Sequence, residues 1–141
     1  MLVRLLYASR VVDKNSTELV NSIMAQARIH NPPQGLTGIL CYSGDIFIQA
    51  LEGSRTAVNA LYSHILSDKR HCDVQILQFE EITERRFSGW TMGQVNLAKL
   101  NTSILLKYSE LPELNPFAVS GAVSMALLDE LIATASIVGR A

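Results

Sequence analysis

The sequence predicts an α+β fold, a ferredoxin-like βαββαββ sandwich with two helices on one face of the sheet and C-terminal helices on the other. The first observation is the order of the apolar stretches, which alternate between strand and helix periodicity as β-α-β-β-α-β-β. The second is "GDIFIQALEG" (44–53), whose two alternating sets of positions are both apolar, so we expect a central strand covered on both sides. The third is that helical stretches follow residue 96 and can supply the second cover.

The first strand is predicted at residues 3–9, where side chains alternate between the two faces. Asn15, with Glu18 three residues later, predicts the start of the first helix as a weak variant of the capping box. Apolar residues at helical spacing form the buried stripe of this helix. The pair Pro32-Pro33 predicts that it ends after Asn31, because the residue before a proline avoids helical geometry.

A hairpin and a second helix follow. The two strands of the hairpin are predicted at residues 36–43 and 45–52, with the turn at Gly44. Ser54 is predicted to cap the second helix. The buried face of that helix is expected to carry Val58, Leu61 and Ile65.

Two further strands are predicted at residues 72–82 and 89–95. Trp90 and Met92 are two residues apart in the second of them, so we expect both side chains on the same face of the sheet. The pattern then breaks near residues 97–103, which ends the predicted sandwich.

The C-terminal segment is predicted to be an output surface and a dimer contact. Helices are expected at about residues 104–110 and 117–138, within an extension (97–141) that follows a core domain (1–96). These helices carry more apolar surface than one sheet face needs, which favours a homodimer. The apolar stripe consists of Val119, Val123, Ala126, Leu127, Leu131 and Ala135, widened by Leu128 and Ile132.

Composition limits the partners and the compartment. The 141 residues include 12 Lys plus Arg and 13 Asp plus Glu with no basic concentration, which argues against direct nucleic-acid binding. The apolar stretch 117–138 is not expected to span a membrane, because Asp129 and Glu130 lie at its centre. Isolated Cys41 and Cys72, three histidines and an N-terminus without a signal-peptide pattern favour a cytoplasmic protein without a zinc site.

Gln49 stands where an apolar residue is expected. Alternation places it with Phe47 and Leu51 on one face, where an unpaired amide would cost about 1–3 kcal/mol. If the first and third strands are neighbours, Tyr7 points into the same helix-covered layer, and its buried hydroxyl also needs a partner. The amide can serve as that partner.

Further polar side chains converge on this layer from the ends of both predicted helices. Singly, each has an ordinary structural explanation, because helix ends are often charged and an asparagine before proline is often a turn residue. Together they describe an orienting rim around a flat, largely apolar ligand. They are Arg28, His30 and Asn31 at the end of the first helix, and Asp68, Arg70 and His71 after the second.

Four stretches, taken in order and with their spacing, are more specific than any single residue. They are "RLLYASR", "HNPPQGLTGILCYSGDIFIQALEG", "DKRH" and "RRFSGWTMG". With them, residues 1 to about 96 resemble the BLUF family of blue-light sensors that use flavin. The resemblance implies a non-covalent flavin (FAD, with FMN or riboflavin as alternatives), no enzymatic activity, and a downstream signalling protein as partner.

The resemblance also implies roles for individual residues. Tyr7 matches the photoactive tyrosine of the family, Gln49 its switching glutamine, and Asn31 the asparagine that holds the pyrimidine edge of the flavin ring. Trp90 and Met92 match the pair that changes environment with the signalling state. The other implied cofactor contacts are Ile23, Arg28, His30 (asparagine in many members), Ile65, Asp68, Arg70 and His71.

In the family's usual account, light transfers an electron and a proton from Tyr7 to the flavin, and their return leaves Gln49 rotated or tautomerised. The residues alone leave two other functions open. One is a small acylphosphatase-like hydrolase on the same fold, with an anion cradle at "EGSR" (52–55). The other is a colourless regulatory module that binds a small metabolite or a partner protein.

Overall fold

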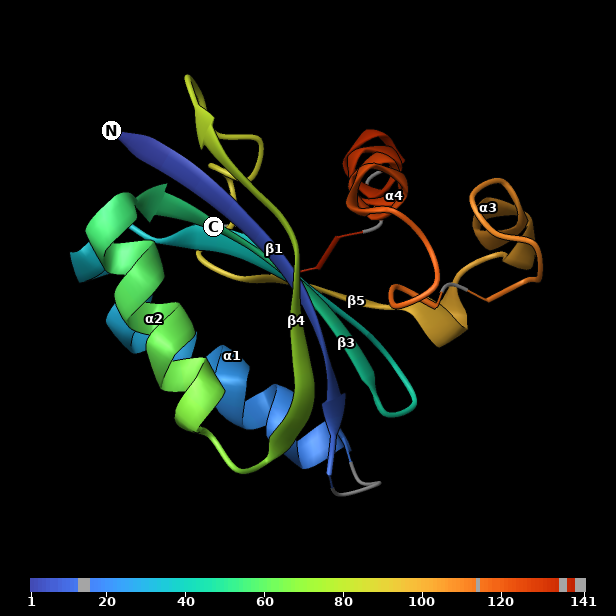
Figure 1. Ribbon diagram of the computed structural model, residues 1–141, viewed down its shortest axis with the longest axis horizontal. Coiled ribbons are helices and arrows are strands. Elements are labelled where there is room, and N and C mark those ends of the chain that lie inside the picture. Colours follow the sequence, from blue (N-terminus) through green and yellow to red (C-terminus); the bar gives the residue numbers. More distant parts are fainter. Residues whose placement is uncertain (13–15, 114, 135–136, 139–141) are drawn as a thin grey trace.

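A five-stranded mixed sheet with helices on both faces forms the molecule (Figure 1). The computed structural model describes residues 1–12, 16–113, 115–134 and 137–138. In chain order the elements are β1 (Leu2–Val11), α1 (Ser16–Gln34), β2 (Thr37–Ser43), β3 (Ile46–Ser54), α2 (Arg55–Ser67), β4 (His71–Ile82), β5 (Gly93–Asn96), the 3₁₀ helix η1 (Leu97–Lys99), α3 (Thr102–Leu106) and α4 (Gly121–Ala133).

The strands lie in the order β4-β1-β3-β2-β5, and α1 and α2 cover one face while α4 covers the other (Figure 1). β1 is antiparallel to both of its neighbours, β3 and β4, whereas β2 and β5 run parallel. Tyr7 on β1 is directly opposite Gln49 on β3. The predicted fold class and the predicted adjacency of the first and third strands are confirmed. The Tyr7 and Gln49 side chains share the face that α1 and α2 cover.

The sheet separates two apolar cores, as the alternation in β3 predicts. Phe47 and Leu51 belong to the core beneath α1 and α2, and Ile48 and Ala50 belong to the core beneath α4. Each large apolar side chain buried in this way contributes about 1.5–3 kcal/mol. The fully buried apolar side chains that α4 supplies are Leu127, Leu128 and Leu131.

Two local predictions, the hairpin turn and the cap of α2, are confirmed. Gly44 has a φ of 57° between β2 and β3, a conformation that glycine adopts without steric cost. Ser54 caps α2, and its Oγ accepts a hydrogen bond of 3.1 Å from the backbone N–H of Ala57.

The predicted end of the first helix is wrong, because α1 continues through Pro32 and Pro33 to Gln34. Gly35 ends it instead, with a φ of 66°. The backbone N–H of Gly35 donates to the carbonyl of Pro32 at 3.1 Å, and that of Leu36 donates to the carbonyl of Asn31 at 3.0 Å. Pro32 and Pro33 leave two helical hydrogen bonds unmade, but the helix continues through them and ends where a left-handed residue closes it. The predicted cap, Asn15, lies outside the described residues.

The predicted fifth strand is also corrected, because β5 comprises only Gly93–Asn96. Trp90 and Met92 precede it in an irregular segment, where the N–H of Trp90 donates to the carbonyl of Phe87 at 3.1 Å. Strand alternation does not apply in such a segment. Trp90 packs in the core beneath α4 and Met92 in the core beneath α1 and α2, so they do not share a face.

The C-terminal helices are shorter than predicted, at residues 102–106 for α3 and 121–133 for α4. Ser120 starts α4 by accepting a hydrogen bond of 3.2 Å from the N–H of Val123. The expectation that Leu128 widens the apolar stripe beyond what one sheet face needs is wrong, because its side chain is fully buried against the sheet. Ala135, assigned to the same stripe, lies outside the described residues.

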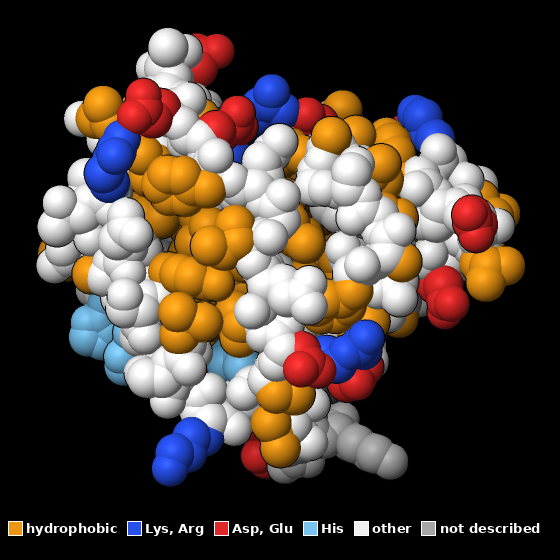
Figure 2. Space-filling view, in the orientation of Figure 1, with side chains coloured by type: hydrophobic (Ala, Val, Ile, Leu, Met, Phe, Trp, Pro, Cys, Tyr) orange, Lys and Arg blue, Asp and Glu red, His pale blue; other side chains and the backbone are white. Residues whose placement is uncertain are grey.

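Exposed apolar side chains are found on β4 instead. Figure 2 shows hydrophobic side chains gathered over the region of β4 and its border with α2. Ile76 and Phe79 of β4 are 55% and 44% exposed, although they pair with buried Tyr7 and Leu5 of β1. β4 is an edge strand, and α1 and α2 leave its outer part uncovered.

Candidate functional site

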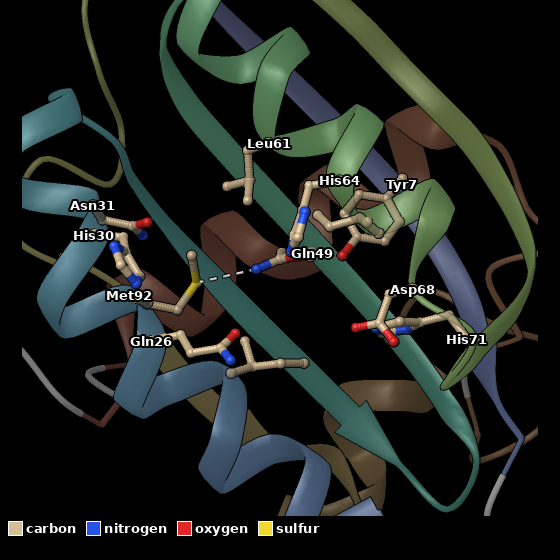
Figure 3. Close-up of a pocket in the computed structure, with 13 residues that line it drawn as sticks. Tyr7, Gln26, His30, Asn31, Gln49, Leu61, His64, Asp68, His71 and Met92 are labelled. Carbon is tan, nitrogen blue, oxygen red and sulfur yellow. Dashed lines mark hydrogen bonds and ion pairs between the residues drawn. The ribbon is translucent and has the colours of Figure 1, made fainter.

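A cavity of about 330 Å³ lies between α1 and α2, on the face of the sheet that these two helices cover (Figure 3). β1 and β3 form its floor, the two helices form its walls, and the segment before β5 closes one end. Its lining is Tyr7, Ile23, Gln26, Ala27, His30, Asn31, Gln49, Leu61, His64, Ile65, Asp68, His71 and Met92.

The floor of the cavity holds a chain of contacts centred on Gln49. The Tyr7 hydroxyl donates a hydrogen bond to Oε1 of Gln49. The other end of the amide, Nε2, donates to the Met92 Sδ at 3.5 Å (Figure 3). Tyr7 is 1% and Gln49 3% exposed, so these contacts replace water for both buried groups. The predicted pairing of Tyr7 with Gln49 is confirmed.

Burial fixes the protonation of the tyrosine. Removal from water raises the pKa of the Tyr7 phenol far above its ordinary value, and the nearby Tyr62 and Asp68 raise the pKa further. The hydroxyl therefore keeps its proton at neutral pH and acts as the donor toward the amide oxygen.

Asn31 links the cavity to the segment before β5. It lies in the last turns of α1, is 4% exposed, and lines the cavity. Its Nδ2 donates to the backbone carbonyl of Thr91 at 2.9 Å, so the residue next to Met92 is tied to α1.

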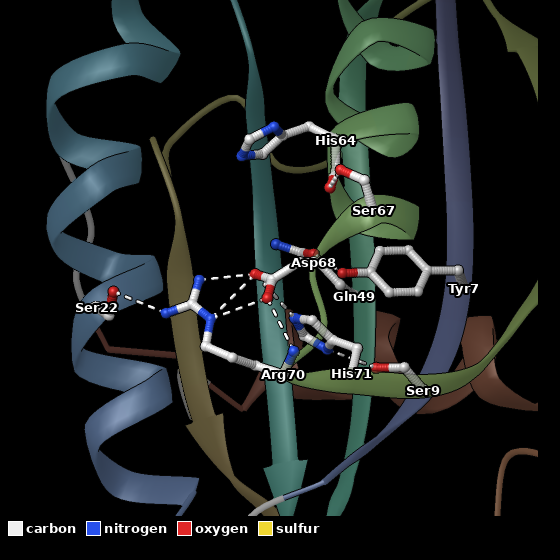
Figure 4. A network of polar contacts seen from close by, with 9 residues as sticks. All are labelled: Tyr7, Ser9, Ser22, Gln49, His64, Ser67, Asp68, Arg70 and His71. Carbon is white, nitrogen blue, oxygen red and sulfur yellow. Dashed lines mark hydrogen bonds and ion pairs between the residues drawn. The ribbon is translucent and has the colours of Figure 1, made fainter.

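A charged cluster follows α2 at the other end of the cavity (Figure 4). Arg70 donates to both carboxylate oxygens of Asp68, with a shortest distance of 2.7 Å, and reaches the Ser22 Oγ on α1 at 3.2 Å. These hydrogen bonds lower the pKa of Asp68 to about 2, so its carboxylate is charged at neutral pH.

His71 is the inner member of this cluster, with its side chain only 3% exposed. Its Nδ1 lies 3.2 Å from the Ser9 Oγ, and its Nε2 lies 4.0 Å from the Asp68 carboxylate (Figure 4). Burial is the main effect on its pKa and lowers it, so the ring is neutral at pH 7.

Most of the residues implied by the sequence meet at this cavity, but three do not line it. Arg28 is exposed on α1, Arg70 acts on the cavity through Asp68, and Trp90 lies on the opposite side of the sheet. Those that line the cavity are Tyr7, Ile23, His30, Asn31, Gln49, Ile65, Asp68, His71 and Met92.

Four lining residues were missed by sequence reasoning: Gln26, Ala27, Leu61 and His64. Helical spacing is a signal that could have found them. Gln26 and Ala27 lie three and four residues after Ile23, Leu61 lies four residues before Ile65, and His64 lies three residues after Leu61.

The "EGSR" stretch, considered above as an anion cradle, is occupied by structural contacts. The Ser54 hydroxyl caps α2, and Arg55 pairs with Glu81. Among the residues that the structure describes, no group of three or more His, Cys, Asp or Glu side chains is placed to hold a metal ion.

The geometry therefore fits a flat, mostly apolar ligand with polar atoms at its edge, and comparison with known proteins agrees. The sequence model of the family described as sensors of blue-light using FAD, BLUF, matches residues 2–93. This chain belongs to the BLUF family. It is a blue-light sensor domain that binds flavin, and the hydrolase and colourless-module alternatives are not supported.

Relatives of known structure include two BLUF proteins that match nearly the whole chain. The photo-activated state of BlsA is 34% identical, with a TM-score of 0.82 over 94% of this chain and 95% of that one. The dark state of BlrB, described as a BLUF protein, is 34% identical, with a TM-score of 0.79 over 95% and 96%.

A third relative is much longer. Photoactivated adenylate cyclase subunit beta of Euglena gracilis is 36% identical over 102 residues, which are 72% of this chain and 12% of that protein. The BLUF domain thus occurs both in short chains and as a small part of a larger enzyme. No helix in the described part of this chain is long and apolar enough to cross a membrane.

The residues around the cavity suit the flavin that BLUF domains bind. Ile23 on α1 and Ile65 on α2 provide apolar side chains from facing helices, as an aromatic ring system requires. Asn31 and Gln49 supply side-chain amides, whose donor and acceptor groups match those at the edge of an isoalloxazine ring.

Proposed function

We propose that this domain reports blue light through a reorientation of the Gln49 amide between Tyr7 and Met92. The observation that carries the proposal is that the two ends of this amide face different partners, the oxygen toward Tyr7 and the nitrogen toward Met92. The bound flavin supplies the absorption of blue light, and the chain supplies position, hydrogen bonds and the movable amide.

The two amide orientations differ in what they offer Met92. In the orientation described above, Nε2 donates to Sδ of Met92. A half-turn of the amide, or the imidic tautomer, changes which of its atoms donate. After a half-turn, Oε1 faces the thioether, and two acceptors form no hydrogen bond. The Met92 contact is therefore made in one state and lost in the other.

Other residues have supporting roles in this proposal. Ile23, Ile65 and Asn31 hold the flavin ring, and His30, Asp68 and His71 contact its edge or its ribityl chain, as supported by their places around the cavity. Arg70 positions Asp68. FAD is the proposed cofactor, and Arg28, exposed on α1, has the weakest support as a contact.

The output surface is proposed to be the C-terminal extension, residues 97–141, acting on a separate signalling protein, with residues 1–96 as the sensor core. We also propose that the protein is a cytoplasmic sensor and has no catalytic activity of its own. A homodimer is also proposed, and it is supported by exposed Leu106 and Leu111, which are 50% and 61% accessible.

Absorption spectroscopy tests the proposed function. Protein loaded with FAD is expected to be yellow, and blue light should move its flavin bands slightly to longer wavelength, with full return in the dark. The shift is expected because reorienting one amide changes the hydrogen bonds to the flavin without changing its oxidation state. A flavin that is only bleached by blue light would contradict the proposal.

A further inference from the structure

The segment from Arg85 to Met92 connects the cavity to the core on the far side of the sheet. Trp90 packs in the core beneath α4, and Met92 lies on the cavity side. The Trp90 carbonyl accepts a hydrogen bond of 3.1 Å from the N–H of Gly38, at the start of β2. The end of the segment that carries Met92 is thus held by β2, by Asn31 and by Gln49.

The beginning of the same segment is held by one buried carboxylate, that of Glu52. The backbone N–H of Phe87 donates to its Oε1 at 2.7 Å, and that of Arg86 donates to its Oε2 at 3.0 Å. Arg4 donates to the same Oε2 through Nε at 2.9 Å and forms an ion pair with it at 2.8 Å. Oε1 therefore accepts from one backbone donor, and Oε2 accepts from one backbone donor and from Arg4.

A carboxylate is not what packing alone would select at this position. Glu52 follows Ile48 and Ala50 on the face of β3 that is covered by α4, and its side chain is 0% exposed. Burial of a charge in an apolar layer is costly unless its partners are all in place. The backbone donors of residues 86 and 87 are among those partners, so the charge requires the segment to be in this position.

The residues held by Glu52 are also the ones that contact α4. Arg86 forms an ion pair with Asp129 of α4, and the buried Phe87 ring packs in the same core as Leu127 and Leu128. A displacement that starts at Met92 therefore meets held residues at 86 and 87, and we expect it to be taken up between them, by the Trp90 side chain that packs beneath α4.

We propose that Glu52 is a positioning residue that fixes the base of the 86–92 segment, so that a change at Met92 moves Trp90 relative to α4. This role rests on the proposed function for the origin of the movement at Met92. The anchoring of Trp90 by Glu52 does not depend on light and is testable without flavin.

Trp90 is the only tryptophan of the chain, so its fluorescence reports this segment directly. The informative variant is Glu52→Gln, which removes the charge and replaces one of the two carboxylate oxygens, both acceptors, with an amide nitrogen, a donor. The matched control is Glu80→Gln: Glu80 pairs with the same Arg4 at 2.8 Å but is 43% exposed, and its charge acts on the segment only at a distance, by raising the pKa of the Arg86 side chain. Both variants are measured as full-length protein, flavin-free and loaded with FAD.

Without flavin, Glu52→Gln should move the Trp90 emission to longer wavelength and raise its quenching by acrylamide about twofold, because local opening exposes a side chain that is 7% accessible. Glu80→Gln should match the wild type. With FAD, Glu52→Gln should keep the light-driven shift of the flavin bands but lose the light-dependent change in Trp90 emission.

Three results would overturn the proposal: unchanged Trp90 quenching in Glu52→Gln, an equal change in Glu80→Gln, or a light-dependent Trp90 signal that survives in Glu52→Gln. If Glu52→Gln does not fold, the double variant Arg4→Met/Glu52→Gln removes both buried charges, and the same Trp90 changes are expected. A wild-type protein without a light-driven flavin shift would instead contradict the proposed function and leave the flavin-free test of Glu52 decisive.

Discussion

Glutamine suits position 49 because its amide has one acceptor end and one donor end, and a neighbouring residue faces each of them. Tyr7 keeps its proton because burial raises the pKa of its phenol, so it requires an acceptor. The Met92 thioether has no proton to give and can only accept weakly, so it faces the donor end of the amide. Glutamate would lack the donor, and leucine would lack both ends. The Gln49 amide is therefore held by a partner at each end, and a half-turn would exchange the atoms that face Tyr7 and Met92.

The Asp68–Arg70 pair predicts a dependence of stability on acid pH. The pKa of Asp68 is about 2 in the folded protein, below its ordinary value of 3.8, because Arg70 donates hydrogen bonds to its charged form. The resulting stabilisation is fully present above about pH 4 and is lost as the pH falls toward 2. Arg70 is 45% exposed, so the contribution is expected to be at most about 1 kcal/mol.

Urea unfolding between pH 5 and pH 2 measures this contribution. The difference in unfolding free energy between wild type and Arg70→Ala should shrink across this range, because at pH 2 the wild-type Asp68 has lost about half of the charge that pairs with Arg70. A difference that stays constant from pH 5 to pH 2 would contradict the assignment of the pair as the cause.

At the scale of the elements, the sequence predicted those with a regular period and erred where the backbone is irregular. The hairpin and the Ser54 cap depend on local chemistry that sequence shows directly. The end of α1 depends on closure by Gly35, which overrides the two prolines before it. Trp90 and Met92 were assigned one face by strand alternation, but their segment makes a turn, and the two side chains enter different cores.

Gly35 offers a test of how α1 ends. Its φ of 66° is unfavourable for residues with a Cβ, and the nearest atom to an added Cβ is the end of the Arg85 side chain at 3.8 Å, so no clash intervenes. Gly35→Ala should therefore lower the unfolding free energy by about 1–2 kcal/mol through backbone strain alone. Gly35→Asn, the matched control, should lose less, because asparagine tolerates this conformation. Equal losses in urea unfolding would argue against Gly35 as the helix terminator.

The whole molecule is a sheet with a ligand cavity on one face and a helical cover on the other. Sequence reasoning predicted both covers because β3 is apolar on both faces. It overestimated the apolar surface of the C-terminal helices, because periodicity shows which residues are apolar but not how much of the sheet one helix hides. The side chains of Leu127, Leu128 and Leu131 are fully buried against the sheet of the same chain, so they are not available to a partner.

Truncation after residue 97 tests the role of the C-terminal cover. Removal of α4 would expose the apolar sheet face that includes Ile39, Ile48 and Ala50, so the remaining core should aggregate. Its cavity, on the opposite face, should still bind FAD and show the light-driven shift. Light scattering on both proteins checks this, and it also measures whether the full-length chain is a dimer. A truncated core as soluble as the full chain would contradict the assigned role of α4.

The light-minus-dark absorption spectrum of Gln49→Leu, loaded with FAD and compared with wild type, tests the central claim most directly. We expect Gln49→Leu to bind FAD and lose the shift, since leucine fills a similar volume without either hydrogen-bonding end. Tyr7→Phe should lose it as well, because the ring remains but the hydroxyl does not. Gln26→Leu, the matched control, changes another amide that lines the cavity and should keep the shift. A normal, reversible shift in FAD-loaded Gln49→Leu would contradict the account.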